Sequence, residues 1–198
     1  MAQSKIAYTP TLLVAYGGPA ENYFYSRENP YHDKKMQYFT PYIDLASKSR
    51  RRPGWFMDEE HVFSKHAEFV ENLINAGGLA GVGSHGQLQG LGFHWELWAI
   101  ASGTSNMNAL KVATILGATS IGLDGDLGTI EVGKLADFII LDKNPLENIR
   151  NTNTVLQVMK NGRLYDGNTL NEIYPRQKKA APFWWQEKKP SGLPGIRK

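Results

Sequence analysis

Leu79-Ala80-Gly81-Val82-Gly83-Ser84-His85-Gly86 is the stretch that decides the fold class of this chain. Its first six residues are small and mostly apolar, which is typical of a short strand buried on both faces, and its last two begin a turn. A helical pattern precedes it over residues 58–76, with Asp58 as N-cap and Gly77-Gly78 as stop, and another follows over residues 93–102. A helix, a buried strand, a turn and a helix in succession indicate an α/β protein.

The segments on either side extend this pattern. Residues 5–9 predict a second short strand, closed by Pro10, and residues 107–116 predict a third helix, capped by Ser105 or Asn106. Residues 17–55 are aromatic, punctuated by proline and aperiodic, with one candidate helix over residues 36–46. Since so long an irregular stretch in a compact domain is usually functional, we expect a lid or a substrate wall there.

The second half of the chain predicts a small β unit. Residues 138–141 predict a strand, and residues 155–160 and 163–165 predict a hairpin around Asn161-Gly162. Asn-Gly is the strongest two-residue hairpin signal, because both turn positions favour positive φ.

Composition and charge exclude several classes of protein. The chain has 198 residues, 41% of them hydrophobic, and no cysteine, so it can form neither disulfides nor thiolate metal sites. No apolar run approaches the roughly 20 residues that span a bilayer, which excludes an integral membrane protein, and no signal peptide is visible after Met1. These features therefore do not determine the cellular compartment of the protein.

The basic character of the chain, with a pI of 9.0, lies in its last segment. Residues 176–198 contain seven Lys and Arg residues and one acid, a net charge of +6, whereas the whole chain carries +3. Residues 1–175 therefore sum to −3. We expect the basic tail to be a solvated end, with a binding arm as the alternative, and we expect no nucleic-acid partner because the folded body is acidic.

His85 is the strongest candidate for chemistry. Parallel α/β proteins place their functional groups in the loops after the carboxyl ends of strands, and the glycines beside His85 let a ligand approach the backbone. We therefore predict His85 as a metal ligand or general base facing a concave, partly polar surface. The alternative is a structural histidine bonded to backbone. His94 and Glu96, at the start of the next helix, are weaker candidates, and no P-loop, G-x-S-x-G or H-E-x-x-H motif is present.

A longer set of motifs resembles the C-terminal end of the amidohydrolase superfamily. The most specific is the run from Gly128 to Asp137 within Leu127-Gly128-Thr129-Ile130-Glu131-Val132-Gly133-Lys134-Leu135-Ala136-Asp137-Phe138. Ser84-His85-Gly86-Gln87-Leu88-Gln89-Gly90 with His94-Trp95-Glu96, and Tyr16-Gly17-Gly18, resemble a narrower branch, the imidazolonepropionase-like hydrolases often fused behind a Tol-type propeller and exported. The resemblance extends to about Arg176.

The resemblance implies a metal-dependent (β/α)8 barrel flanked by a small β-sandwich. Residues 5–11 then correspond to strand seven and residues 79–84 to strand eight. His85 stands where the family has a metal-binding aspartate, and Gln87, His94, Glu96 and Tyr16 become side chains that contact the substrate or support the site from behind. The strands that carry the family's other metal ligands have no counterpart here, and a barrel needs roughly 250 residues, so we expect a C-terminal fragment.

These observations lead to a definite set of expectations. Residues 1–125 are expected to be the C-terminal part of the barrel, residues 126–175 a segment of a composite β-sandwich, and residues 176–198 the basic tail. The expected function is that of an amidohydrolase that cleaves carbon–nitrogen bonds of non-peptide or cyclic amides, or of dipeptides, with metal-activated water; the alternative is a non-catalytic interaction module.

The expected cofactor and partners follow from the same resemblance. The cofactor is a divalent metal, for which we expect zinc, in the full-length enzyme. The partners are a small-molecule substrate and either the missing N-terminal barrel half or a second copy of the chain. The branch suggests a periplasmic or secreted protein. We expect the chain alone to hold no catalytic metal and to be inactive, because catalytic zinc needs about three protein ligands.

Overall fold

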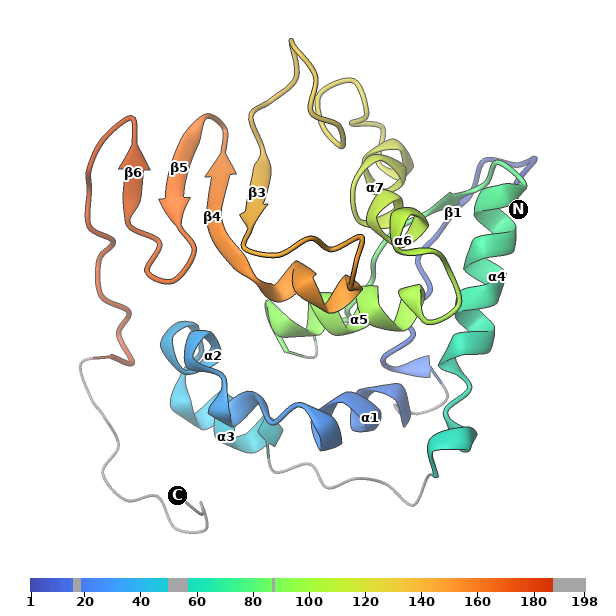
Figure 1. Ribbon diagram of the computed structural model, residues 1–198, viewed down its shortest axis with the longest axis horizontal. Helices are drawn as coiled ribbons and strands as arrows, with labels where there is room; N and C mark the ends of the chain where they lie inside the picture. Colours follow the sequence, from blue (N-terminus) through green and yellow to red (C-terminus); the bar gives the residue numbers. More distant parts are fainter. Residues whose placement is uncertain (16–18, 50–56, 87, 187–198) are drawn as a thin grey trace.

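The computed structural model describes residues 1–15, 19–49, 57–86 and 88–186. Two sheets organise these residues, a parallel pair and a four-stranded antiparallel sheet (Figure 1). The pair consists of β1 (Ala7–Tyr8) and β2 (Leu79–Ala80), so residues 79–86 correctly predict an α/β protein with a parallel strand. The hydrogen-bonded ladder is shorter than expected, because only two residue pairs face each other before both chains leave the sheet.

The helix before β2 is α4 (Phe63–Asn75), and its end matches the prediction. Gly77, with φ of +78°, donates to the carbonyl of Ile74, and Gly78 donates to the carbonyl of Leu73, each at 2.8 Å. This is a Schellman motif, for which glycine is favoured because it adopts the left-handed region without a Cβ penalty. The buried face of the helix is formed by Ala67, Val70 and Leu73.

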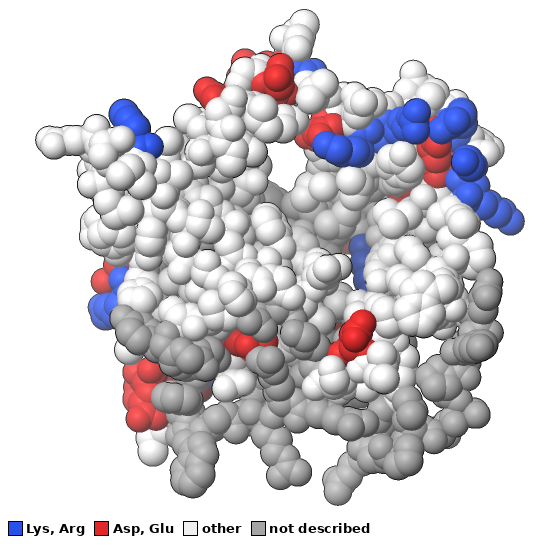
Figure 2. All heavy atoms as spheres, turned by 180° about the vertical axis from the view of Figure 1, so that it is seen from behind, with Lys and Arg blue, Asp and Glu red and all other residues white. Residues whose placement is uncertain are grey.

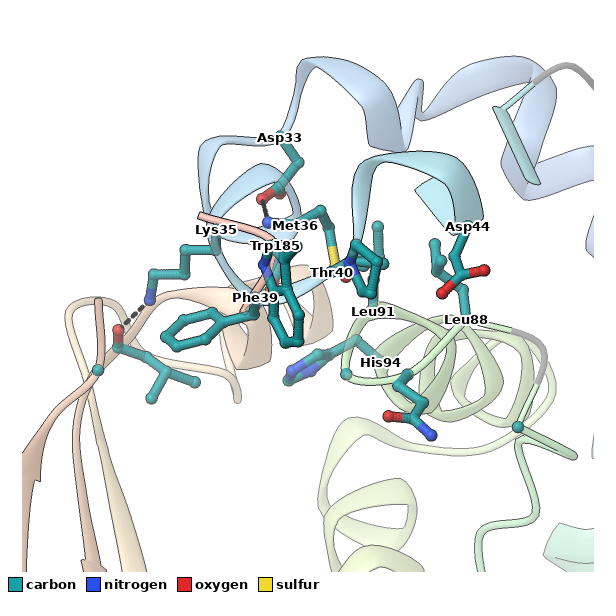
Figure 3. Close-up of a pocket in the computed structure, with 17 residues that line it drawn as sticks. Asp33, Lys35, Met36, Phe39, Thr40, Asp44, Leu88, Leu91, His94 and Trp185 are labelled. Atoms are coloured by element: carbon teal, nitrogen blue, oxygen red, sulfur yellow. Dashed lines mark hydrogen bonds between the residues drawn. The ribbon is translucent and has the colours of Figure 1, made fainter. Parts of the chain in front are cut away.

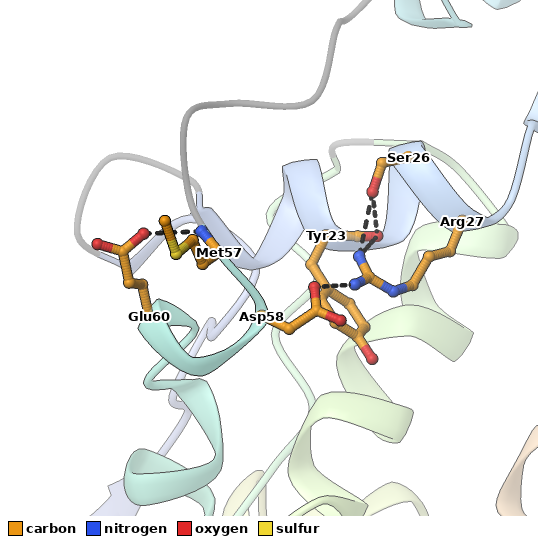
Figure 4. Close-up of polar contacts among 6 residues, drawn as sticks. All are labelled: Tyr23, Ser26, Arg27, Met57, Asp58 and Glu60. Carbon is orange, nitrogen blue, oxygen red and sulfur yellow. Dashed lines mark hydrogen bonds and ion pairs between the residues drawn. The ribbon is translucent and has the colours of Figure 1, made fainter.

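The predicted start of this helix at Asp58 is wrong. Asp58 begins a separate 3-10 turn, η3 (Asp58–Glu60), and α4 starts only at Phe63. The carboxylate of Asp58 is engaged by the Arg27 guanidinium, which also donates at 3.2 Å to the carbonyl of Tyr23 (Figure 4). This ion pair joins η3 to the first helix of the chain, so Asp58 does not cap α4.

The central helix is α5 (Leu91–Ala101), which lies across the middle of the molecule (Figure 1). It contacts α1 (Pro19–Arg27), α4, α6 (Asn106–Ala113) and the 3-10 segment η4 (Ile149–Asn153). Because neighbours surround it, α5 is buried on nearly every side, and Trp95, Leu97, Ala99 and Ile100 are at most 2% exposed. The predicted cap of α6 is confirmed as Ser105, which accepts from the Asn108 N–H at 3.1 Å.

The predicted helix over residues 107–116 is divided in two by Thr114. Its φ of −129° and ψ of −100° lie outside the helical region, so α6 ends there and α7 (Ile115–Ser120) begins. The chain therefore turns between two short helices instead of continuing along one axis.

The aromatic stretch over residues 17–55 is helical where it is described. It forms α1, η2 (Pro30–His32), α2 (Lys34–Phe39) and α3 (Tyr42–Ser49), and residues 16–18 and 50–56 lie outside the described part. The single helix expected over residues 36–46 is divided at Thr40-Pro41, because proline lacks the N–H that a continuous helix needs. Asp33 caps α2 by accepting from the Met36 N–H at 2.9 Å.

The second sheet contains β3 (Phe138–Leu141), β4 (Val155–Lys160), β5 (Arg163–Asp166) and β6 (Glu172–Tyr174), in that order. Asn161 and Gly162, with φ of +49° and +74°, form the predicted turn between β4 and β5. Every hydrophobic residue of this sheet is at least partly exposed, and the buried hydrophobic residues of the described chain all lie at or before Ala118. The sheet therefore adds no side chain to the hydrophobic core.

The first part of the expected tail packs against the body. The ring of Phe183 lies parallel to that of Trp185, with centroids 4.5 Å apart, and the indole N–H of Trp185 donates to the Tyr38 carbonyl at 3.2 Å. Residues 187–198 lie outside the described part. In the described residues, none of the helices has the length and apolar character that crossing a membrane requires.

Candidate functional site

The loops that follow β1 and β2 lie against each other. The strands are parallel, so both loops leave the sheet at the same edge. A Cβ built on Gly83 would lie 2.4 Å from Thr9 Cγ2 and 2.8 Å from Thr11 Oγ1, which is closer than packed atoms approach. Glycine at this position therefore allows the two loops to touch.

His85 stands in the loop after β2, as the sequence predicts. It is exposed, and its φ of +55° together with that of Gly86 at +64° turns the chain sharply toward α5. The wall of a pocket begins at the next residue, Gly86. The role of His85 as a metal ligand or general base stays a prediction.

This pocket lies between α2 and α3 on one side and the beginning of α5 on the other (Figure 3). Its volume is about 680 Å³. Figure 3 shows the Trp185 indole, from the C-terminal segment, standing between Phe39 and His94. The described part of the expected substrate wall therefore does line a pocket, through Asp33, Lys35, Met36, Phe39, Thr40, Pro41 and Asp44.

His94 is the imidazole of this pocket. Its Nδ1 lies 3.2 Å from the hydroxyl of Thr152, which also accepts the indole N–H of Trp98 at 3.0 Å. Burial, reinforced by the positive charge of Lys35, lowers the pKa of His94 to about 4. The ring is therefore neutral at pH 7 and acts there as a hydrogen-bonding group, not as a cation.

Lys35 is the cation of the same pocket. Its ammonium group donates to the Val155 carbonyl at the start of β4, the contact drawn as a dashed line in Figure 3. Burial lowers the pKa of Lys35, and the negative charges of Asp33 and Asp166 oppose that effect. Lys35 thus links α2 to the second sheet at the rim of the pocket.

Glu96 does not face the pocket. It is 0% exposed, and its two carboxylate oxygens accept from the backbone N–H groups of Leu12 at 2.6 Å and Leu13 at 2.9 Å. Burial raises the pKa of Glu96 to about 7, while the two backbone hydrogen bonds act in the opposite direction. The prediction that Glu96 contacts a substrate or supports the site from behind stays a prediction, and its side chain reaches the loop after β1 from inside the core.

Two other predicted residues, Gln87 and Tyr16, lie outside the described residues. Sequence reasoning missed Lys35, Thr152 and Trp185, which converge on His94 or its pocket from distant segments. Only Lys35, two residues after the helix cap at Asp33, carried a local signal, and that signal concerned the helix, not the pocket.

The described residues of this chain do not form a complete metal site by themselves. Within the described ranges, no three His, Asp or Glu side chains come together as a metal ion would need. His85 supplies one imidazole, and Glu96 is occupied by backbone N–H groups. We therefore derive no chemical step through a metal from this chain.

Three comparisons relate the chain to known proteins. A profile described as the amidohydrolase family matches residues 43–165, more than half of the chain. The imidazolonepropionase of Syntrophobacter fumaroxidans is 46% identical over 54 residues, which are 27% of this chain and 13% of that protein. The 5'-deoxyadenosine deaminase of Methanobrevibacter smithii is 54% identical over 41 residues, which are 21% of this chain and 9% of that protein.

A solved structure is similar over a longer range. It is a Xaa-Pro dipeptidase with bound methionine in the active site, 25% identical, with a TM-score of 0.53, and the match covers 84% of this chain and 36% of that one. The chain thus spans little more than a third of that dipeptidase and smaller shares of the two curated relatives.

Proposed function

The chain belongs to the amidohydrolase family, and from that premise we propose that it supplies the last two βα units of a metal-dependent hydrolase barrel, with a small flanking β-sandwich segment. The bond cleaved is a carbon–nitrogen bond of a cyclic amide, another non-peptide amide or a dipeptide. The observation that carries the proposal is the parallel pairing of β1 with β2, with both following loops in contact at one edge. Barrel enzymes place their chemistry at that edge.

The surface of the second sheet supports the composite β-sandwich. Ile139, Leu156 and Ile173 are 50%, 44% and 38% exposed, and Val132 before the sheet is fully exposed. A sheet normally buries one face against another layer, and larger exposed apolar patches mark sites of interaction. We propose that strands from the missing N-terminal part of the barrel protein, or a second copy of this chain, cover these exposed apolar side chains.

We assign two different roles to the histidines. His85, at the strand end, would contribute one metal ligand or accept a proton in the complete enzyme, where other segments add the remaining ligands. His94, neutral and held by Thr152, would orient a bound substrate through a hydrogen bond in the pocket. The Trp185 indole and Phe39 would pack against the apolar part of that substrate.

The distribution of charged side chains on the surface indicates which kind of partner the chain binds. Figure 2 shows Lys and Arg side chains gathered along one upper edge of the molecule, with Asp and Glu beside them. Lys160 pairs with Asp137, and Arg176 pairs with Glu172. This mixed charge favours a small-molecule substrate over a nucleic acid, whose phosphates need a basic surface.

The first test reads the genomic DNA upstream of the codon for Met1. We expect an in-frame H-x-H motif followed by further strands, and its absence over the length of a barrel would contradict the proposal.

The second test measures zinc by elemental analysis in the metal-supplemented 198-residue chain, its His85→Ala variant and a His32→Ala control. We expect no stoichiometric zinc and no amide hydrolysis in any of them.

The alternative function is a non-catalytic interaction module, which needs no metal in any form. The complete reading frame separates the two functions. Zinc that is present in the longer protein and lost in its His85→Ala variant supports the hydrolase, and a longer protein that binds a partner but never zinc supports the module. Stoichiometric zinc in the isolated chain that disappears in His85→Ala would overturn the expectation that the chain alone is incomplete.

A further inference from the structure

Glu96 is a buried carboxylate with no part in the pocket, yet both of its oxygens are used. The side chain extends from α5 to the loop after β1 and binds two consecutive backbone N–H groups there, 83 and 84 residues away in the sequence. Leu12 and Leu13, which carry these N–H groups, are themselves 0% exposed. Above about pH 7 Glu96 is ionised, and hydrogen bonds from backbone N–H to an ionised carboxylate are roughly twice as strong as neutral ones.

The loop after β1 is shaped to receive such a group. Thr11 has a φ of +50°, and the following residues form a tight turn in which Val14 donates to Thr11 and Ala15 donates to Leu12, each at 3.3 Å. The N–H groups of Leu12 and Leu13 come at the start of this turn, where the turn itself offers them no acceptor. Consecutive N–H groups in such a turn form a concavity that binds an anion, and here Glu96 fills it.

The same loop touches the loop that carries His85. Gly83 packs so closely against Thr9 and Thr11 that no side chain fits between them. The chain then passes through His85 and Gly86 into α5, which carries Glu96. The contacts therefore close a ring, from the loop after β1 to Glu96, along α5 to the loop after β2, and back to the loop after β1.

We propose that Glu96 is a positioning residue, which holds the loops after β1 and β2 together and thereby fixes His85 and the wall of the pocket that begins at Gly86. The inference rests on the proposed function for the role of His85, because it concerns the same strand ends. Above about pH 7, where Glu96 is ionised, both of its oxygens accept, whereas a glutamine would offer one acceptor and turn its NH2 group toward a backbone N–H that is also a donor.

The test is amide hydrogen exchange, read by NMR above pH 7 so that Glu96 is ionised, in the wild-type chain, in Glu96→Gln and in a Glu131→Gln control. Glu131 lies on an exposed turn far along the chain. In Glu96→Gln we expect the amides of Leu12 and Leu13 to exchange faster on the order of tenfold or more, with residues 9–15 and 81–86 losing protection and α6 keeping it. Unchanged protection, or a loss spread evenly over α4, α5 and α6, would overturn the proposal.

A spectroscopic readout separates positioning from plain stability. The imidazole C–H resonance of His85, assigned with His85→Ala, is expected to shift or broaden in Glu96→Gln, whereas that of His32 stays in place. If His85 and His32 respond alike, Glu96 supports the core and does not position the loop. If Glu96→Gln does not change amide exchange, the role of Glu96 is disproved. If the longer protein keeps its zinc in His85→Ala, the proposed function is disproved. The two failures are therefore distinguishable.

If Glu96→Gln does not fold, amide exchange in the wild-type chain alone still tests the proposal. The Leu12 and Leu13 amides belong to a loop, and yet the proposal requires that they exchange as slowly as the amides in the middle of α5. Exchange at the rate of an exposed turn in the wild-type chain would overturn the proposal without any variant.

Discussion

The indole N–H of Trp98 donates to the hydroxyl of Thr152 at 3.0 Å, and this contact helps to join the central helix α5 to the segment η4 that leads into the second sheet. The two residues are 54 positions apart. Arg150 adds to the junction, since its guanidinium lies 4.8 Å over the Trp98 ring and pairs with Glu28 of the segment after α1. The junction therefore couples the pocket histidine, which shares the Thr152 hydroxyl, to the fold of the second sheet.

Replacing Thr152 with valine tests this junction. Valine has nearly the same shape but no acceptor, so the buried Trp98 N–H is left without its partner. We expect a loss of about 1–3 kcal/mol in the free energy of unfolding, measured by urea denaturation. Thr152→Ser keeps the hydroxyl and is the matched control, and equal losses in the two variants would show that the methyl group matters instead.

The raised pKa of Glu96 predicts how stability depends on pH. The folded chain holds the proton up to about pH 7, whereas the unfolded chain loses it near the ordinary value of 4.5. The contribution of Glu96 protonation to the free energy of unfolding is therefore fully present below pH 4.5 and is lost as the pH rises through 7. The loss is on the order of 3 kcal/mol. Thermal melts of Glu96→Gln against wild type between pH 4.5 and 7.5 should show that this pH-dependent loss is gone.

The lowered pKa of His94 predicts the opposite slope. Its contribution to stability is fully present above pH 6.5, the ordinary value, and is lost as the pH falls toward the folded value of about 4. The two groups oppose each other between about pH 4.5 and 6.5. We therefore expect stability to rise with pH in Glu96→Gln and to fall with pH in His94→Gln over that window. If stability changed with pH in the same direction in both variants, the assignment of the raised pKa to Glu96 and the lowered pKa to His94 would be contradicted.

Gly83 should not tolerate a side chain. A Cβ there would lie 2.4 Å from the methyl group of Thr9, so the loops after β1 and β2 would have to separate. We expect Gly83→Ala to cost about 1–3 kcal/mol in the free energy of unfolding and to increase the exchange of the Leu12 amide. Thr9→Ser, which removes that methyl group, should restore part of the loss. Gly125→Ala, with open space around it, should be neutral.

The local elements of this protein follow from its sequence, because their signals act over a few residues. The glycine pair at residues 77–78 ends α4, and the Asn161-Gly162 turn forms the hairpin of β4 and β5, since both depend on which residues accept a positive φ. The apolar stretch after α4 likewise predicts a strand. The motif over residues 127–138 predicts the family, and the profile match that confirms it covers that motif.

The candidate site depended on tertiary structure. His94 and Glu96 are two residues apart and look equivalent in the sequence, yet one lines the pocket and the other binds the loop after β1. The helices over residues 19–49 and the wall formed by Trp185 gave no periodic signal either. The reason is physical: periodicity says which residues share a face of a helix, but what that face meets is set by segments 50 to 150 residues away, as the Thr152, Leu12 and Tyr38 contacts are.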